Sequence, residues 1–282
     1  MEIILAKSAG FCFGVHRAVD MAFKTEEDKK TYTLGHIIHN ETVTRKLKQK
    51  GIDSVDVLDH TPMEKVIIRA HGVPEAVYKE AQLKNIEVLD ATCPYVTKIH
   101  KLVSRYEQEG YGIIVIGDAQ HPEIIGINGW TQKGCIIYKS KEDVDVTLLN
   151  KDHKYLIVSQ TTYKKEVVES IVQLLEKLGY DIKFINTICN ATSERQEEAK
   201  KIAKEVDSMI VIGSSFSSNT QKLFEICQSY CPDTYCIEDA SGLRAEWFIS
   251  KDKVGVTAGA STPQDVIQEV VETLESLSLI HI

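Results

Sequence analysis

The sequence predicts an α/β protein built from three small α/β domains in a pseudo-threefold trefoil. Three observations lead to this prediction. Short apolar runs alternate with helical patterns along the whole chain of 282 residues. The runs are apolar throughout instead of at every second residue, which is typical of strands buried on both faces of a parallel or mixed sheet. An order of strand, lone cysteine and amphipathic helix occurs three times, which indicates a domain-scale triplication.

The expected strands account for the first two observations. They are, in chain order, IILA, TYTLG, VIIRA, EVLDAT, GIIVIG, YLIVS, DIKFINT, MIVIG, TYCIED and VGVTAG. The runs have the length of strands, and segments with helical periodicity lie between many of them. Strands that alternate with helices are the pattern of parallel sheets with crossover helices.

The cysteine repeat sets the expected domain boundaries. IILA leads to Cys12, EVLDAT to Cys93 and DIKFINT to Cys189, and an amphipathic helix follows each cysteine. The strands before Cys93 and Cys189 close the first and second repeats, so the strand before Cys12 should close the third. The predicted domains are residues 14–93, residues 94–189, and residues 190–282 together with residues 1–13. A single continuous sheet would contradict this arrangement.

Polar loops recur at corresponding places in the repeats. About 30 residues after each cysteine, a strand runs into GHIIHN, GDAQHPE or GSSFSSN, and a later strand ends in AHG, SQTT or TAGAST. These loops are rich in neutral or cationic hydrogen-bond donors and poor in carboxylates, which suits a phosphate or diphosphate group. The candidate binding residues are His39, His71, His121, Thr161, Thr162, Ser217, Ser218, Asn219 and Ser261. The alternative for an isolated loop histidine is simple solvation.

A metal site is the second expectation for the strand ends. Ligands of open α/β sheets gather where the strands end, and helix N-termini there favour a thiolate. Three thiolates suit an iron–sulfur cluster better than a structural zinc site, which takes four protein ligands. We therefore expect one 4Fe-4S cluster on Cys12, Cys93 and Cys189, with one open iron, and Gly10 and Gly14 would leave room for it. Air exposure can leave a 3Fe-4S form, because the iron without a protein ligand is lost most easily.

Other interpretations of the cysteines stay open. A single cysteine at a strand end is often ordinary core packing. Cys227, Cys231 and Cys236 form a local C-x3-C-x4-C run that could hold a metal, although the first two fit a helix end and the third lies in the expected strand TYCIED. Neither spacing matches the C-x2-C pattern of common zinc or ferredoxin sites. Cys135, directly before IIY, is expected in the core.

One carboxylate stands apart from the donor-rich loops. Glu123 follows His121 by two residues in HPE, at the mouth of the expected site. A reduction that expels hydroxide needs a positioned acid, so Glu123 is the candidate proton donor, and Thr161 could orient or relay the proton. The alternative is an exposed loop acid without a role.

The composition argues against several partners and locations. The net charge is −8 and no basic stripe with interleaved aromatic residues occurs, which argues against nucleic-acid binding. No stretch approaches the roughly 20 apolar residues of a membrane span, and the start MEIILAKSAG has no basic lead, so we expect neither a signal peptide nor an anchor. We expect a cytoplasmic protein without a membrane partner, whose seven cysteines serve metal, redox chemistry or packing.

Together the motifs resemble the 4-hydroxy-3-methylbut-2-enyl diphosphate reductase family. The resemblance rests on GFCFGV, HIIHN, AHGV, DATCPYVTK, HPEIIG, SQTT, GSSFSSNT and TAGAST, which occur in the right order over nearly the whole chain. It implies an oxidoreductase with a trefoil fold around a 4Fe-4S cluster on the three repeated cysteines. Such an enzyme removes the allylic hydroxyl of its substrate with two electrons and two protons, and it forms isopentenyl and dimethylallyl diphosphates in the non-mevalonate pathway of isoprene biosynthesis.

The resemblance also implies roles for single residues and for a partner. The implied diphosphate contacts are His39, His71, His121, Ser217, Ser218, Asn219 and Ser261. The implied proton route is Glu123 with Thr161. A ferredoxin- or flavodoxin-type electron donor is expected, and the chain itself has no flavin or nicotinamide fingerprint.

Two other classes of function remain open. A non-redox hydro-lyase also uses a three-cysteine cluster with an open iron, and it would form product without an electron donor. A non-catalytic anion-binding or metal-sensing module would stay colourless after anaerobic purification with iron and sulfide supplied.

Overall fold

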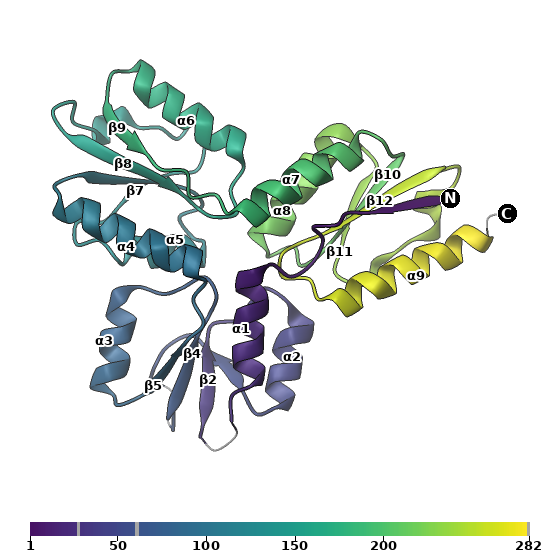
Figure 1. Ribbon diagram of the computed structural model, residues 1–282, viewed down its shortest axis with the longest axis horizontal. Helices are drawn as coiled ribbons and strands as arrows, with labels where there is room; N and C mark the ends of the chain where they lie inside the picture. The colour runs from purple at the N-terminus through teal and green to yellow at the C-terminus, as the bar shows by residue number, and fades with distance from the viewer. Residues whose placement is uncertain (27–28, 60–61, 281–282) are drawn as a thin grey trace. The chain divides into compact units, whose positions relative to one another are not determined.

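The protein has three separate parallel sheets (Figure 1). The computed structural model describes residues 1–26, 29–59 and 62–280. Within these residues each sheet has four strands, and every paired strand is parallel to its neighbour. The prediction of three small α/β domains is confirmed, and a single continuous sheet is excluded.

The sheet of the first repeat has the strand order β3-β2-β4-β5. Its strands are β2 (Thr31–Leu34), β3 (Asp53–Val55), β4 (Lys65–Ile68) and β5 (Glu87–Asp90), and its helices are α1 (Phe13–Phe23), α2 (Glu41–Gln49) and α3 (Glu75–Leu83). Leu34, Val66 and Ile68 pack with Ala81 of α3 in one buried cluster. Figure 1 shows α1 and α2 on the opposite side of this sheet from α3.

The sheet of the second repeat has the equivalent order β7-β6-β8-β9. Its elements are α4 (Pro94–Gln108), β6 (Gly112–Ile116), α5 (Pro122–Asn128), β7 (Ile136–Tyr138), the 3₁₀ turn η1 (Val146–Leu148), β8 (Lys154–Ser159), α6 (Lys165–Lys177) and β9 (Asp181–Phe184). Ile114, Ile116 and Ile157 share a cluster with α6. Ile113 and Val115 instead share a cluster with α4 and α5.

The sheet of the third repeat has the order β1-β12-β10-β11. Its elements are β1 (Glu2–Leu5), α7 (Asn190–Ala203), β10 (Ser208–Ile212), α8 (Ser218–Tyr230), β11 (Thr234–Ile237), η2 (Ala240–Gly242), η3 (Ala245–Phe248), β12 (Lys253–Ala258) and α9 (Gln264–Ile280). β1 pairs with β12 in parallel, from Glu2 opposite Lys253 to Leu5 opposite Val256. This confirms that the N-terminal strand closes the last sheet.

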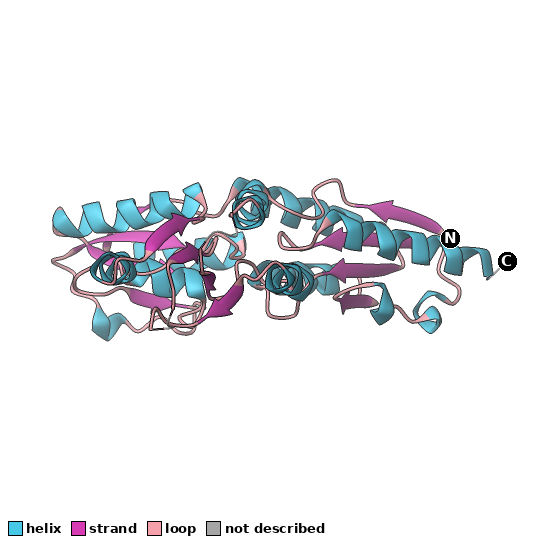
Figure 2. Cartoon of the chain, turned by 90° about the horizontal axis from the view of Figure 1, so that it is seen from below, coloured by secondary structure: helices cyan, strands magenta, loops and turns pink. Residues whose placement is uncertain are grey.

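Two helix layers explain why the strands are apolar at every position. Along β10, Ile210 and Ile212 belong to the cluster formed with α9, whereas Met209 and Val211 belong to the cluster formed with α7 and α8. Successive strand residues face opposite sides of a sheet, so a strand between two layers of helices buries both sets. Figure 2 shows strands with helices on either side.

Contacts divide the chain into two compact units. The first unit contains Met1–His16, His39–Glu41 and Asn190–Ile282, and the second contains Arg17–Ile38 and Thr42–Cys189. The second unit thus contains the first two sheets, and the first unit contains the third. The domain boundaries after residues 13, 93 and 189, and the trefoil arrangement, stay predictions.

The strands β3 and β7 were not among the expected strands. Each has three residues and lies at an edge of its sheet, so each has only one strand neighbour. A segment this short carries too few apolar positions to be identified by its pattern. Among the described residues, no helix is both long and apolar enough to span a membrane.

Candidate active site

The three repeated cysteines have the same place relative to their sheets. The main-chain amide of each donates a hydrogen bond to a carbonyl just beyond the central strand β4, β8 or β12. The pairs are Cys93 with Ala70 (3.0 Å) and Cys189 with Thr161 (3.0 Å) in the second unit, and Cys12 with Ala260 (3.4 Å) in the first. Each acceptor is the second residue after its strand. Each cysteine therefore lies at the carboxyl end of its own parallel sheet, where ligands of such sheets bind.

The same hydrogen bonds align the loops that follow the three central strands. Thr161 has the place of Ala70 and Ala260, so the residue equivalent to His71 and Ser261 is Thr162.

The other four cysteines are poor candidates for metal ligands. Burial raises the pKa of Cys227 to about 12 and that of Cys135 to about 11. Desolvation also raises the pKa of Cys231 and of Cys236, although the Cys236 residue is partly accessible at the surface. A raised pKa disfavours the thiolate that a metal requires. The local run of three cysteines, two of which are buried, is therefore a weak metal site, whereas the repeated cysteines are only half-buried.

Gly10, two residues before Cys12, is required by the fold itself. Gly10 has a φ of +97°, and a Cβ atom there would lie 2.9 Å from the Cδ1 atom of Ile267. Positive φ and close packing against α9 both require glycine. The conformation and the packing of the main chain therefore explain the glycine at this position.

Asn219 offers a buried donor in the first unit. Its side chain is 3% exposed, and its Oδ1 atom accepts a hydrogen bond from the Ala260 amide over 2.9 Å. This bond fixes the orientation of the side-chain amide. Neither the Asn219 Nδ2 atom nor the buried Oγ atom of Ser261 has a hydrogen-bond partner among the described residues. Buried polar groups in proteins are normally paired, so these two atoms are available to a ligand with acceptor oxygens.

The remaining predicted residues of this unit lie at helix starts. Ser217 is the N-cap of α8, and its Oγ atom accepts a hydrogen bond from the Thr220 amide over 3.4 Å. Ser218 is the first residue of that helix. His39 belongs to the same unit, two residues before α2 begins. The N-terminus of a helix carries partial positive charge and attracts anions.

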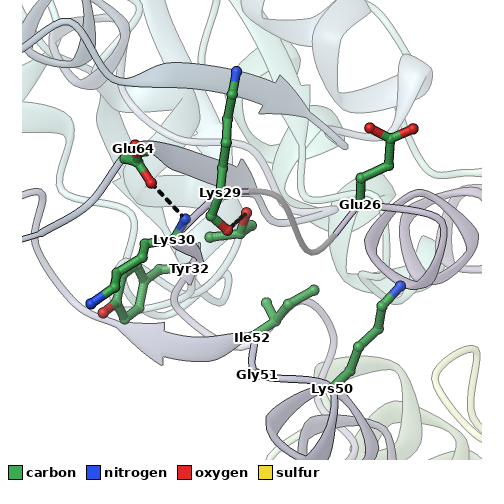
Figure 3. Close-up of a pocket in the computed structure, with 9 residues that line it drawn as sticks. Glu26, Lys29, Lys30, Tyr32, Lys50, Gly51, Ile52 and Glu64 are labelled. Carbon is green, nitrogen blue, oxygen red and sulfur yellow. Dashed lines mark hydrogen bonds between the residues drawn. The ribbon is translucent and has the colours of Figure 1, made fainter.

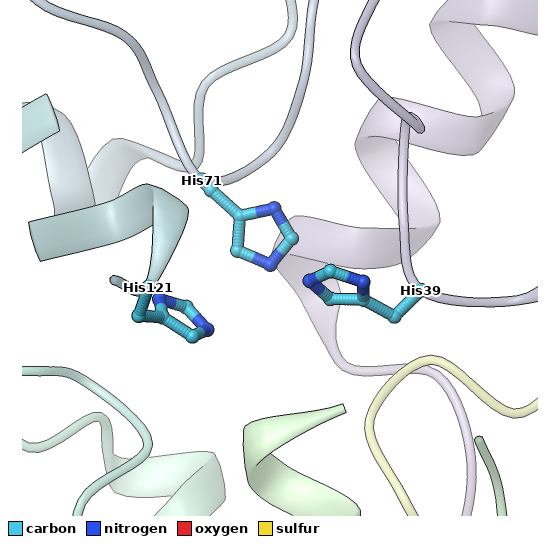
Figure 4. Close-up of side chains that lie close together, drawn as sticks. All are labelled: His39, His71 and His121. Atoms are coloured by element: carbon cyan, nitrogen blue, oxygen red, sulfur yellow. The ribbon is translucent and has the colours of Figure 1, made fainter. Parts of the chain in front are cut away.

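Two of the predicted histidines lie together in the second unit. The rings of His71 and His121 have centroids 5.4 Å apart and meet edge to face at 79° (Figure 4). His121 is the N-cap of α5, and its Nδ1 atom accepts a hydrogen bond from the Glu123 amide over 3.1 Å. An accepting Nδ1 atom places the proton of the neutral ring on Nε2. His121 is thereby prepared to donate from Nε2.

Glu123 is a buried acid and not the exposed loop residue that was the alternative. Its side chain is 2% exposed. Its Oε1 atom accepts from the Thr161 amide over 2.6 Å, and its Oε2 atom lies 2.7 Å from the Thr161 hydroxyl. Burial raises the pKa of Glu123 to about 7, although both contacts with Thr161 act to lower it. The carboxyl group is therefore poised between its acid and base forms near neutral pH, as general acid catalysis requires.

The raised pKa of Glu123 predicts a pH-dependent contribution to stability. Its pKa is about 7 in the folded protein against an ordinary 4.5, so between these values the unfolded chain releases a proton that the folded chain keeps. The free energy of unfolding should therefore fall as the pH rises from about 4.5 to about 7, by about 3 kcal/mol for this group. Denaturant titrations at about pH 4.5 and about pH 8 should show a larger loss for the wild type than for Glu123→Gln. An identical pH dependence in both proteins would contradict the raised pKa.

Sequence reasoning missed the residues that support these side chains. Gln160 is fully buried, and it accepts from the Asp118 amide over 3.2 Å and donates to the Thr162 hydroxyl over 3.0 Å. It thereby joins the loops after β6 and β8. The only available signal was its place in the motif SQTT, between a strand and two expected site residues.

A second support holds the loop that follows His71. His100 of α4 is 2% exposed and stacks on Trp130 with ring centroids 5.1 Å apart. The indole of Trp130 donates to the Val73 carbonyl over 3.0 Å, which holds the loop after His71. Burial lowers the pKa of His100 to about 4, so this ring stays neutral at physiological pH. In the sequence, His100 is indistinguishable from other apolar-face positions of its helix.

A cavity of about 650 Å³ lies away from all predicted site residues. It is lined by Thr31 and Tyr32 at the start of β2 and by Lys50 before β3, so it is at the amino edge of its sheet (Figure 3). Its Glu64 carboxylate accepts from the Lys30 amide over 2.9 Å. The candidate active site is at the opposite, carboxyl edge of the strands.

Several known proteins are similar to this chain over nearly its whole length. A family profile described as "LytB protein" matches residues 3–275. A protein of Clostridioides difficile (strain 630) named 4-hydroxy-3-methylbut-2-enyl diphosphate reductase is 48% identical over 280 residues, which cover 98% of this chain and 100% of that protein. A solved structure described as (E)-4-hydroxy-3-methyl-but-2-enyl diphosphate reductase, the terminal enzyme of the non-mevalonate pathway, matches with a TM-score of 0.71 and 41% identity, covering 98% of this chain and 100% of that one. The structure of the E-1-hydroxy-2-methyl-but-2-enyl-4-diphosphate reductase from Plasmodium falciparum matches with a TM-score of 0.91 and 32% identity, covering 97% and 87%.

Proposed function

Because the chain belongs to the LytB protein family, we propose that it is a 4-hydroxy-3-methylbut-2-enyl diphosphate reductase. The reaction removes the allylic hydroxyl with two electrons and two protons, and it releases water together with isopentenyl or dimethylallyl diphosphate. It is a step of isoprenoid biosynthesis by the non-mevalonate pathway. The observation that carries the proposal is the 48% identity, over 98% of the chain, to a protein of that name.

Cys12, Cys93 and Cys189 would hold a 4Fe-4S cluster. Their equivalent places at the carboxyl ends of the three sheets support this assignment, as do the raised thiol pKa values of the other four cysteines. When bound by three cysteines, such a cluster supplies electrons and one open iron that acts as a Lewis acid.

The diphosphate group would be held by neutral and cationic donors. The proposed contacts are His39, His71, His121, Thr161, Ser217, Ser218, Asn219 and Ser261. The buried donor of Asn219 and the buried hydroxyl of Ser261 support an anionic ligand, because each needs an acceptor that the described residues do not offer it. The Nε2 atom of His121 and the start of α8 add donors of the same kind.

Glu123 would supply the proton that makes hydroxide a leaving group. Its pKa of about 7 keeps a proton available near neutral pH. In the acid form its O–H group can donate to the Thr161 hydroxyl, which lies 2.7 Å away. The Thr161 hydroxyl is then free to donate its own hydrogen onward, so the pair can pass a proton to bound substrate.

Replacing Asn219 by aspartate should weaken substrate binding. The change keeps the acceptor for the Ala260 amide and replaces the donor Nδ2 by an oxygen that repels a diphosphate. We expect the Michaelis constant to rise roughly 10- to 100-fold, the range set by one charge-assisted hydrogen bond, with the iron content unchanged. Asn150→Asp is the matched control, since its Oδ1 atom also accepts a main-chain amide, that of Asp152, on an exposed segment. Unchanged kinetics of Asn219→Asp would remove this loop from the binding site.

The electron donor is proposed to be a ferredoxin or a flavodoxin. The family resemblance implies a small redox protein as the donor. The chain, whose net charge is −8, has no flavin or nicotinamide fingerprint of its own. The proposed location is the cytoplasm. The seven cysteines, all within the described residues, form no disulfide, which supports this location, because disulfides are rare in reducing compartments.

Anaerobic assays test the proposed function against its two alternatives. Protein purified anaerobically with iron and sulfide should be brown, and it should consume substrate only when a reductant such as reduced methyl viologen is present. Product formation without any reductant would favour a hydro-lyase. Colourless protein without iron would favour a non-catalytic binding module.

A further inference from the structure

The segment that leads to Cys12 is anchored to α7 by a buried arginine. Arg195 is 3% exposed. Its Nε atom donates to the Ser8 carbonyl over 2.9 Å, and its Nη2 atom donates to the Gly10 carbonyl over 2.8 Å. The planar guanidinium group thus binds two carbonyls of one loop at once, a geometry that a lysine cannot reproduce.

The carboxylate one turn further along α7 binds the same loop from its amide side. The two carboxylate oxygens of Glu198 accept from the Lys7 amide over 2.9 Å and from the Ser8 amide over 2.8 Å. The Ser8 hydroxyl donates to the same side chain over 2.6 Å. Burial opposes ionisation of Glu198, but the bonds from Ser8 and Lys7 outweigh it and lower its pKa below the ordinary value. The cationic Arg195 therefore binds the carbonyls of the loop, and the anionic Glu198 binds its amides.

Besides Arg195, Glu198 and the packing of Gly10 on α9, the main chain of the loop is held by few hydrogen bonds. It connects the end of β1 at Leu5 to the start of α1 at Phe13, and Cys12 is its last residue. The amide of Cys12 makes a comparatively long bond of 3.4 Å to the Ala260 carbonyl. Gly10 has a conformation that other residues rarely adopt. Because the bond at the end of the loop is long, the contacts of Arg195 and Glu198 are the short bonds that fix the course of its main chain.

We propose that Arg195 and Glu198 are positioning residues that hold the main chain of Cys12 for cluster binding, an inference that rests on the proposed function. The helix α7 begins at Asn190, directly after Cys189 in the chain. One helix thus follows the proposed ligand Cys189 and also anchors the loop that carries Cys12. Arg195, Glu198 and the loop that they bind form a clamp, which lies wholly within the first unit of the protein. Arg195 and Glu198 bind main-chain atoms of residues 7, 8 and 10, so they act through the position of Cys12.

The test compares Arg195→Gln and Arg195→Lys with Lys201→Gln, an exposed change on the same helix that touches no part of the loop. The first readout is the rate at which iodoacetamide alkylates each cysteine of the cluster-free chain, resolved by peptide mass spectrometry. We expect Cys12 to react roughly 10-fold faster in Arg195→Gln, as follows from the loss of one charge-assisted hydrogen bond, with Cys93 unchanged. Arg195→Lys should be intermediate, since it keeps the charge and loses the fork.

The second readout is the rate of iron loss to a chelator from the reconstituted, anaerobic protein. Arg195→Gln should lose iron roughly 10-fold faster than wild type and Lys201→Gln at the wild-type rate, at equal thermal unfolding midpoints. Unchanged alkylation of Cys12 in both arginine variants would overturn the clamp. An equally large increase in the alkylation rates of Cys93 and the buried Cys227 would overturn it too, because that pattern indicates general unfolding. A wild-type protein that binds no iron would overturn the proposed function instead, while the alkylation readout would still decide on the clamp.

Discussion

Serine in place of Cys93 is expected to leave the anaerobically prepared protein without a cluster and without reductase activity. A serine hydroxyl does not ionise near neutral pH and is a hard oxygen donor, so it does not replace a soft thiolate on iron. The main-chain bond from residue 93 to the Ala70 carbonyl does not involve the side chain, so the fold should persist. Iron and sulfide content, the visible absorption spectrum and turnover measure the outcome, and Cys12→Ser and Cys189→Ser should behave in the same way.

Cys236→Ser is the matched control for these variants. Cys236 is exposed, so its serine variant should keep the cluster and the activity of the wild type. Cys227 is completely buried in the apolar cluster between α7, α8 and the sheet, so alanine is the better replacement there, because a buried hydroxyl without a partner costs stability. An active, cluster-loaded Cys93→Ser protein would overturn the ligand assignment.

Glu123→Gln is expected to turn over at least roughly 100-fold more slowly, the low end for general acid catalysis. Glutamine keeps the shape of the side chain, and its Oε1 atom can still accept from the Thr161 amide. Its NH₂ group can donate to the Thr161 hydroxyl, but it carries no proton that can be transferred near neutral pH. Cluster content and substrate affinity should therefore stay close to wild type while the turnover number falls.

Two controls separate the acid role of Glu123 from a structural one. Glu107 lies in the same domain and accepts two main-chain bonds, from Gln132 over 2.7 Å and from Lys133 over 2.8 Å, so Glu107→Gln should keep normal turnover. The pH profile gives the second control. The acid form of Glu123 disappears as the pH rises through its pKa of about 7, so wild-type turnover should fall above that pH. Near-normal turnover of Glu123→Gln would leave the proton source unassigned.

The sequence predicted three separate sheets because their buried strands are apolar at successive positions. Runs such as MIVI, which became β10 (Ser208–Ile212), must be apolar on both faces between two helix layers. The place of β1 beside β12 followed from the repeat, since the strand before each cysteine closes a sheet. The edge strands β3 and β7 were missed, because a three-residue strand with one neighbour imposes little pattern on its sequence.

The side-chain environments were much less predictable than the elements. Glu123 has the letter pattern of a loop acid, and only the tertiary structure buries it against Thr161. The orientation of Asn219 depends on Ala260, 41 residues away in the chain. The contact of Arg195 with the loop before Cys12 spans more than 180 residues. A lone charged residue on a helix carries no local sign of so distant a partner.

The electron balance of the reaction tests whether the protein is a reductase. Reduced methyl viologen and substrate are supplied anaerobically to the cluster-loaded protein, and oxidised viologen is counted against the isopentenyl and dimethylallyl diphosphates formed. The proposed reduction predicts two electrons consumed for each product molecule, and no product without the reductant. Substrate loss without any oxidation of viologen would contradict the account, because the chain would then act on the hydroxyl without reducing it.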